Sequence, residues 1–260
     1  MEHRDEIEAL IVVGGDGMVH LGTQVCAEHG LPLGIMAAGS GNDAAATLRL
    51  PIHDMRAAAR RIEDGLRGEI QAVDVGRVRG PAVDFPSAPR YFLAVLSAGI
   101  DAAVAAYGSQ LTFPRGPLKY KVATMREIPR YRPYGLTVTI GDEREDTRCT
   151  LVAVANTPVF GGGLIISPDS SMTDGLLEAV VTEPLTRREI LQIFPKLRNG
   201  SHKCDPRIRT VKTTSVTIAQ HQGGARLPVA FADGELVGTE PLTVDIAPGA
   251  LTVLGGRARA

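Results

Sequence analysis

The sequence predicts a small α/β domain followed by a larger antiparallel β-sandwich domain. Two observations predict the first domain: short apolar segments near the start of the chain each end in a glycine-rich loop, and each loop leads into a helical pattern. A third observation predicts the second domain, because short valine- and threonine-rich runs bounded by glycine, proline or aspartate fill the chain after residue 70. A chain of 260 residues that is 44% hydrophobic is long enough to form both cores.

Strands and helices alternate over the first part of the chain. Apolar runs predict strands at residues 9–13 and 33–37, and the segments after them predict helices at residues 19–28, 43–48 and 54–63. Strands separated by single helices of this length pair in parallel. We therefore expect a short parallel sheet with crossover helices.

From residue 70 onward the pattern changes to short strands. Thr186 and Glu189 have the spacing of a capping box, which predicts the start of one of two helices in this part. A stretch rich in proline and small residues, 80–89, is expected to be a hairpin loop. We accordingly divide the chain into domains at residues 1–69 and 70–260. The expected strands lie at residues 91–96, 136–140, 150–155, 176–181, 213–218 and 242–246, and the expected helices at residues 116–128 and 186–198.

Two glycine loops carry the clearest functional signal. The first strand ends in Gly14-Gly15-Asp16-Gly17, and the second is followed by Gly39-Ser40-Gly41-Asn42-Asp43. Glycine has no Cβ and adopts positive φ, so backbone N–H groups in such loops can approach a phosphate closely. The carboxyl ends of parallel strands are also where open α/β sheets bind ligands. Asp-Gly is common in plain turns, but two such loops together predict a phosphate site with a metal-binding carboxylate.

These loops resemble the Gly-Gly-Asp-Gly-Thr and Gly-Thr/Ser-Gly-Asn-Asp motifs of the diacylglycerol kinase catalytic-domain family, which includes bacterial lipid kinases and sphingosine kinases. Two further blocks follow in the family's order. Asn156-Thr157-Pro158, the glycines at 161–163 and Asp174-Gly175-Leu176-Leu177 match the third block, and Asp233-Gly234-Glu235 matches the fourth. Two positions depart from the family's pattern: Met18 replaces the usual threonine, and Ala44 a common phenylalanine.

The resemblance implies a kinase that transfers phosphate from ATP, with Mg2+, to the hydroxyl of diacylglycerol or a related lipid in a cleft between the domains. It implies catalytic roles for Asp16, Asp233 and Glu235, with Asp233 as the general base. It implies metal ligation by Asp16, Asp43 and Asp174, the last for a structural ion. The implied nucleotide-binding residues are Gly14, Gly15, Gly17, Gly39, Ser40, Gly41 and Asn42.

Three of the acidic residues also have a simpler interpretation. Asp43 stands where a helix N-cap is expected. Asp233-Gly234 is a typical sequence for a type I′ hairpin turn, which the residues alone favour over a general base. Asp174 follows Ser170-Ser171-Met172-Thr173 rather than further acids, so a plain turn fits as well as a weak cation site. His202 is expected to be a hydrogen-bonded structural residue.

Charge and cysteine content exclude several classes of protein. A formal net charge of -1 argues against a general nucleic-acid binder. Cys26, Cys149 and Cys204 are scattered, which argues against a disulfide framework or a zinc site and fits a reducing compartment. The charged first residues do not resemble a signal peptide, and no apolar run approaches the roughly 18 residues that span a bilayer. We therefore expect a cytoplasmic protein.

Basic and apolar residues are mixed between residues 107 and 134. This mixture suits an anionic membrane surface and predicts peripheral binding at the inner membrane face, where the lipid substrate lies. The alternative is a solvated helix whose apolar stripe packs on the β domain. The basic residues are Arg115, Lys119, Lys121, Arg126, Arg130 and Arg132.

The first domain is short for its type. The family resemblance implies an opening strand with an Asn-Pro-x-Ser-Gly-like turn ahead of the first glycine loop, and the sequence starts without them. A sheet that lacks this strand exposes an edge, so we expect weak ATP binding and a tendency to form a homodimer. Two alternatives to an active lipid kinase remain: an NAD kinase-like small-molecule kinase that shares the first loop, and a catalytically impaired paralogue that binds lipid or nucleotide.

Overall fold

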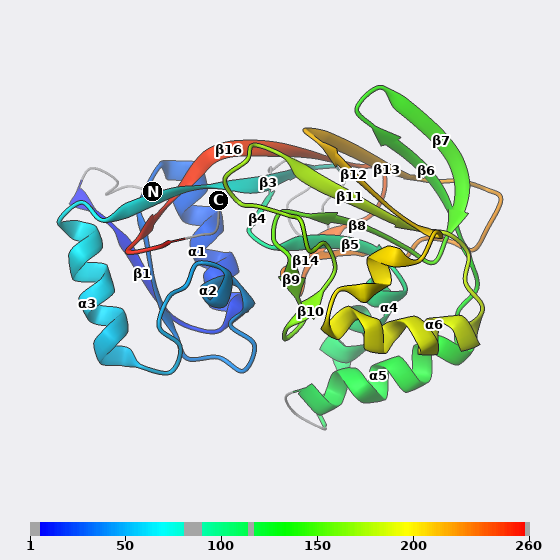
Figure 1. The fold of residues 1–260 in the computed structure, drawn as a ribbon, viewed down its shortest axis with the longest axis horizontal. Coiled ribbons are helices and arrows are strands. Elements are labelled where there is room, and N and C mark those ends of the chain that lie inside the picture. Colours follow the sequence, from blue (N-terminus) through cyan, green and yellow to red (C-terminus); the bar gives the residue numbers. More distant parts are fainter. Residues whose placement is uncertain (1–5, 81–89, 114–116, 258–260) are drawn as a thin grey trace.

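The computed structural model describes residues 6–80, 90–113 and 117–257. An α/β part and a β-rich part lie side by side, with helices clustered below the strands of the second part (Figure 1). This architecture confirms the predicted fold class. None of the described helices has both the length and the apolar character needed to cross a bilayer.

The α/β part contains the predicted strand–helix alternation. Strand β1 (Leu10–Gly14) pairs in parallel with β2 (Leu33–Ala37), and helix α1 (Asp16–His29) connects them. Helices α2 (Asp43–Thr47) and α3 (Met55–Leu66) follow β2. Each glycine loop therefore lies at the carboxyl end of a parallel strand and at the start of a helix, as the sequence predicts.

A long ribbon of two strands connects the two parts. Strand β3 (Ile70–Arg79) runs antiparallel to β16 (Leu242–Leu254) along most of its length. Near its end, β16 pairs in parallel with β2, through Val253 opposite Leu33. The last strand of the chain thus completes the sheet of the α/β part, and the side chains of both ribbon strands enter its core.

The β-rich part is a sandwich of two sheets. The first sheet continues from the α/β part in the order β1-β2-β16-β13-β6-β7, with β3 paired to β16 and β4 (Arg90–Phe92) paired to β3. The second has the order β12-β11-β8-β5-β14-β15, and buried side chains of both sheets share one core. The remaining bounds are β5 (Val95–Gly99), β6 (Tyr134–Ile140), β7 (Glu143–Cys149), β8 (Leu151–Ala155), β9 (Val159–Phe160), β10 (Leu164–Ile165), β11 (Leu177–Thr182), β12 (Ile208–Thr213), β13 (Ser215–Gln220), β14 (Ala230–Ala232) and β15 (Glu235–Gly238).

Helices cover one face of the second sheet. Helix α5 (Pro117–Arg130) matches a predicted helix, and α6 (Arg187–Ile193) begins with the predicted capping box at Thr186. The 3-10 helix η2 (Phe194–Arg198) replaces the rest of the second predicted helix, because Pro195 has no N–H to donate. A second 3-10 helix, η3, is Ser201–Cys204.

Two differences from the sequence prediction lie next to the site described below. The strand expected at 91–96 is divided into β4 and β5, and an unpredicted helix, α4 (Ile100–Gln110), follows β5 directly. The expected strand is divided because the backbone N–H groups between β4 and β5 donate to a side chain instead of a neighbouring strand. The loop predicted at 80–89 lies almost entirely outside the described residues.

Candidate active site

The two glycine loops pack backbone against backbone. A Cβ on Gly39 would lie 2.2 Å from Gly15 Cα, and a Cβ on Gly41 would lie 2.4 Å from Asp16 Oδ2. The Ala38 N–H donates to the carbonyl oxygen of Gly14 at 2.8 Å. Side chains at these glycines would force the loops apart, so glycine is required for this contact. The N-terminus of α1 lies beside this contact and is suited to bind an anion.

Asp16, the first residue of α1, has one satisfied and one unsatisfied oxygen. Its Oδ2 accepts the N–H of Asn42 at 2.9 Å and so links the two loops. Its Oδ1 is buried and has no hydrogen-bond partner among the described residues. Burial raises the pKa of Asp16, and the negative charges of Asp43 and Asp233 raise it further. An unsatisfied carboxylate oxygen among other acids is suited to bind a cation.

Asn42 and Asp43 shape the second loop. Asn42 has a φ of 60° and is the N-cap of α2, so the interpretation of Asp43 as the N-cap is wrong. The Asn42 side chain accepts from Gly39 N at 2.9 Å and donates to Gly39 O at 2.6 Å, which closes the loop on itself. Asp43 Oδ2 instead accepts the N–H of Gly162 at 2.7 Å, from the β9–β10 loop of the sandwich.

Asp233 forms the tip of the hairpin between β14 and β15. Its φ is 53° and that of Gly234 is 85°, the two positive values that a type I′ turn requires. The predicted turn is therefore present. It directs the Asp233 side chain toward the segment between β4 and β5.

The Asp233 carboxylate is fully hydrogen-bonded. Its Oδ2 accepts the N–H of Leu93 at 2.9 Å and lies 3.2 Å from His20 Nδ1. Its Oδ1 accepts the N–H groups of Ala94 at 2.8 Å and Val95 at 3.3 Å. A carboxylate has about four acceptor positions, so none is left over. Of the four partners, His20 is the only side chain.

His20 is a site residue that the sequence prediction missed. It lies on α1 four residues after Asp16, which places both side chains on the same face of the helix. Its Nε2 lies 3.4 Å from the Gln24 side-chain nitrogen, and Gln24 Oε1 accepts the N–H of Tyr91 at 2.9 Å. The helical spacing from Asp16 is the signal that could have identified it.

Glu235 lies over the first glycine loop. Its Oε1 is 3.1 Å from the position of a Cβ on Gly17, and the residue is exposed. The hairpin of the sandwich thus brings two carboxylates, Asp233 and Glu235, to the loops of the α/β part.

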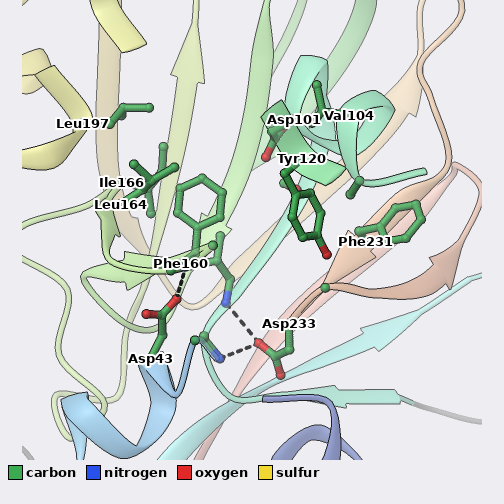
Figure 2. Close-up of a pocket in the computed structure, with 18 of the residues that line it drawn as sticks. Asp43, Asp101, Val104, Tyr120, Phe160, Leu164, Ile166, Leu197, Phe231 and Asp233 are labelled. Atoms are coloured by element: carbon green, nitrogen blue, oxygen red, sulfur yellow. Dashed lines mark hydrogen bonds between the residues drawn. The ribbon is translucent and has the colours of Figure 1, made fainter. Parts of the chain in front are cut away.

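One continuous cavity of about 730 Å³ connects the glycine loops to an apolar chamber in the β-rich part. In Figure 2, Asp43 and Asp233 lie at one end, with Phe160, Leu164, Ile166 and Leu197 on one side and Val104, Tyr120 and Phe231 on the other. The polar end holds the loops and the acids, and the chamber is walled by α4, α5, α6 and the second sheet. Other apolar residues of the chamber are Ile100, Ile128, Leu151, Val180, Leu185, Ile190, Ile193 and Ile208.

Asp174 is the predicted metal ligand that the fold does not bring to this cavity. Its Oδ1 accepts the N–H of Leu176 at 3.1 Å, and its Oδ2 is 2.7 Å from Lys212 Nζ. The Lys212 ammonium therefore supplies positive charge beside this carboxylate.

The acids of the cavity fit a metal ion that arrives with phosphate groups. Among the described residues, no three His, Cys, Asp or Glu side chains are grouped as a metal site. Magnesium commonly takes only one or two carboxylate oxygens from a protein and completes its shell with water and substrate phosphate. The unsatisfied Asp16 Oδ1 suits that arrangement.

Comparisons with known proteins agree with this geometry. Residues 2–78 match the model of the diacylglycerol kinase catalytic domain, and residues 94–255 match that of the YegS C-terminal NAD kinase beta sandwich-like domain. A diacylglycerol kinase from Mycobacterium tuberculosis (strain CDC 1551 / Oshkosh) is 32% identical over 96% of this chain and 77% of its own length. The chain belongs to the diacylglycerol kinase catalytic-domain family. It is therefore a lipid kinase, a phosphotransferase.

This chain is similar to further proteins over most of its length. A protein from Chromohalobacter salexigens named "Probable lipid kinase YegS-like" is 29% identical over 94% of this chain and 75% of its own length. The crystal structure of a diacylglycerol kinase from Bacillus anthracis str. Sterne superposes with a TM-score of 0.66 at 20% identity, covering 97% of this chain and 78% of that one. At this sequence identity, the similarity to the crystal structure shows the fold alone.

Proposed function

We propose that this lipid kinase transfers the γ-phosphoryl group of ATP to the hydroxyl of diacylglycerol or a related lipid, at the junction of its two parts. The supporting observation is the cavity itself, which joins two phosphate-type glycine loops to an apolar chamber. A nucleotide needs the first feature and a lipid needs the second. The acids between them lie where the two substrates would meet.

On the nucleotide side, binding rests on the backbone of the two loops. Gly15 and Gly17, at the N-terminus of α1, line the cavity together with Gly39, Ser40 and Gly41, so their N–H groups are the ones that would bind phosphate. Met18 offers no hydroxyl, so the backbone carries this contact. A magnesium ion bound there would neutralise charge on the phosphates, and Asp16 Oδ1 is the oxygen that would hold it.

On the acceptor side, Asp233 would take the proton of the lipid hydroxyl. The acceptor position now filled by His20 Nδ1 is the one that such a hydroxyl would use, while the three backbone N–H groups keep the carboxylate in place. Glu235, beside Gly17, would orient the phosphate end or share the metal ion.

The lipid chains would fill the chamber, and α5 would face the membrane. This helix lines the cavity with one face, through Tyr120 and Ile128, and leaves Leu118 52% and Met125 78% exposed. Lys121, Arg126 and Arg130 are exposed on the same helix. A basic and apolar surface beside a lipid cavity suits an anionic membrane. The predicted Arg115 lies outside the described residues.

The test is transfer of phosphate from labelled ATP to dioleoylglycerol in mixed micelles with Mg2+. Asp16→Asn keeps the shape of the side chain and removes its charge, so the rate should fall at least about a hundredfold. Because burial and neighbouring acids disfavour the charged form of Asp16, the variant should fold at least as well as the native protein. Asp142→Asn, on the exposed β6–β7 turn, is the matched control. Near-native turnover in Asp16→Asn would remove this residue from the mechanism.

A further inference from the structure

Two buried hydrogen-bond acceptors in the wall of the apolar chamber make no hydrogen bond of normal geometry with the described residues. They are the carboxylate of Asp101 and Nδ1 of His202, and both residues line the cavity. Buried polar atoms in folded proteins are nearly always hydrogen-bonded, so each exception needs an explanation. The proposed phosphate transfer uses neither group.

Asp101 is the second residue of α4. Both of its carboxylate oxygens are inaccessible to solvent, and neither has a hydrogen-bond partner among the described residues. Figure 2 shows the side chain directed into the cavity, between Phe160 and Tyr120. Burial raises the pKa of Asp101 to about 6, although the nearby Ser97 hydroxyl and the first amides of α4 act in the opposite direction.

His202 lies in η3 and is 1% exposed. Its Nε2 is 3.0 Å from the carbonyl oxygen of Ile166. A carbonyl oxygen can only accept, so Nε2 carries the proton of this bond and Nδ1 of the neutral ring is an acceptor. Ile166 lies on the side of the cavity opposite Val104 in Figure 2, so the two unsatisfied acceptors come from different walls.

We propose that the chamber binds a hydroxylated lipid, whose chain carries a hydroxyl group that donates to the Asp101 carboxylate. A hydroxyl fits better than an ammonium, since it can donate to the carboxylate and costs far less to transfer into an apolar chamber. This inference rests on the proposed function, because it assumes that the chamber holds the lipid chains.

The recognised hydroxyl is separate from the one that is phosphorylated. Asp233 N–H donates to Val95 O at one end of β5, and Asp101 follows the other end of that strand at Gly99. Four steps along a strand cover about 13 Å. A lipid whose head hydroxyl lies at Asp233 therefore meets Asp101 with its chain and not with its head.

The experiment compares lipids that differ by one hydroxyl. The probes are 1-ricinoleoylglycerol, with a mid-chain hydroxyl, 1-oleoylglycerol, which lacks it, and 1-(2-hydroxyoleoyl)glycerol, with the extra hydroxyl next to the head. Dissociation constants are measured by competition with a fluorescent acyl probe in detergent micelles, and phosphate transfer is measured in parallel. A hydrogen bond to a charged group predicts at least about tenfold tighter binding of the mid-chain alcohol than of 1-oleoylglycerol. The 2-hydroxy lipid should show no such gain.

Asp101→Leu should bring the ratio of the two dissociation constants close to one. Its midpoint of thermal unfolding should not fall, because the substitution replaces an unsatisfied buried carboxyl by an apolar group. Asp101→Asn, of nearly the same shape, keeps one acceptor oxygen and should give an intermediate ratio. Asp142→Leu, on the exposed β6–β7 turn, should keep the native ratio.

The outcomes separate this inference from the kinase proposal. A native ratio near one, or a preference that survives in Asp101→Leu, would overturn the hydroxyl site and mean that water satisfies the acceptors. Should Asp101→Leu fail to fold, a native ratio in Asp101→Asn would overturn the site equally. A mid-chain preference without phosphate transfer would support the site and count against the proposed activity. If no lipid binds, the hydroxyl site and the proposed kinase activity are both wrong.

Discussion

The four aspartates that line the cavity differ in how their oxygens are satisfied. Asp233 has every acceptor position filled, Asp43 binds the Gly162 N–H, Asp16 has one free oxygen and Asp101 has two. A free, buried carboxylate oxygen is costly, so these two residues are the ones that gain from a ligand. We therefore propose these two aspartates as ligand-binding residues, Asp16 for a cation and Asp101 for a hydroxyl donor.

Asp101 should make stability depend on pH. Its pKa is about 6 in the folded protein against an ordinary value of 3.8, so the folded state holds the proton more tightly than the unfolded state. The contribution of Asp101 to the free energy of unfolding is therefore greatest below about pH 4 and is lost as the pH rises through 6. Two pKa units correspond to about 3 kcal/mol. We expect the free energy of unfolding of the native protein, relative to Asp101→Asn, to fall by that order between pH 4 and 6.5. A flat difference in denaturant titrations would show that the carboxyl is solvated.

Asp233→Asn should damage both stability and catalysis. The amide replaces one acceptor oxygen by a donor, which leaves at least one of the backbone N–H groups between Leu93 and Val95 unsatisfied at about 1–3 kcal/mol. Loss of the general base should lower the rate by about 10²–10⁴. Rates measured well below the unfolding midpoint separate the two effects, with Asp142→Asn in another hairpin turn as control. If the folded Asp233→Asn variant kept native turnover, the role of Asp233 would be limited to the hairpin turn.

Sequence analysis at this scale finds residues that belong to motifs. Asp16 and Asp233 were identified because glycine neighbours mark them, and both line the cavity. His20 and Asp101 stand in helices without a motif, and only the fold shows that one meets Asp233 and the other faces the chamber. Asp174 was identified by its motif, but its partner Lys212 comes from a strand 38 positions away.

At the scale of elements, the contact between the two glycine loops fixes the nucleotide side of the cavity. The strands β1 and β2 are parallel and in register, so their carboxyl ends bring Gly14 opposite Ala37 and the loops into contact. This part was predictable, because the alternation of strand and helix determines it. Helix α4 was not, since the sequence analysis assigned no helix or strand to the residues between the strand expected at 91–96 and the helix expected at 116–128.

Gly39→Ala should disrupt this contact. The new Cβ would lie 2.2 Å from Gly15 Cα, a backbone atom that cannot rotate away. We expect a loss of at least about 1–3 kcal/mol in the free energy of unfolding, together with weaker ATP binding by calorimetry. Ser40→Ala changes an exposed side chain in the same loop and should stay within about 0.5 kcal/mol. Equal stability of the two variants would show that the loops separate freely.

At the scale of the whole molecule, the α/β part and the sandwich are connected through the sheet and through hydrogen bonds at the cavity, among them the His20–Asp233 contact. The β3–β16 ribbon joins them covalently and through the sheet. The Asp43–Gly162 hydrogen bond joins α2 to the β9–β10 loop at the cavity. The sequence indicated the two parts but not the return of β16 to β2, because nothing local in β16 marks its parallel partner.

Asp43 should couple nucleotide binding to lipid binding. Asp43→Ala removes the acceptor and leaves the Gly162 N–H without it, so the β9–β10 loop should lose protection in hydrogen exchange. The affinity for ATP should then no longer change when lipid is added. Asp43→Asn keeps an acceptor oxygen but removes the charge that raises the pKa of Asp16, so it should preserve the coupling. Loss of coupling in both variants would mean that charge, and not the hydrogen bond, connects the two halves. Retention in both would mean that the ribbon and the His20–Asp233 contact, which neither substitution touches, are sufficient for the coupling.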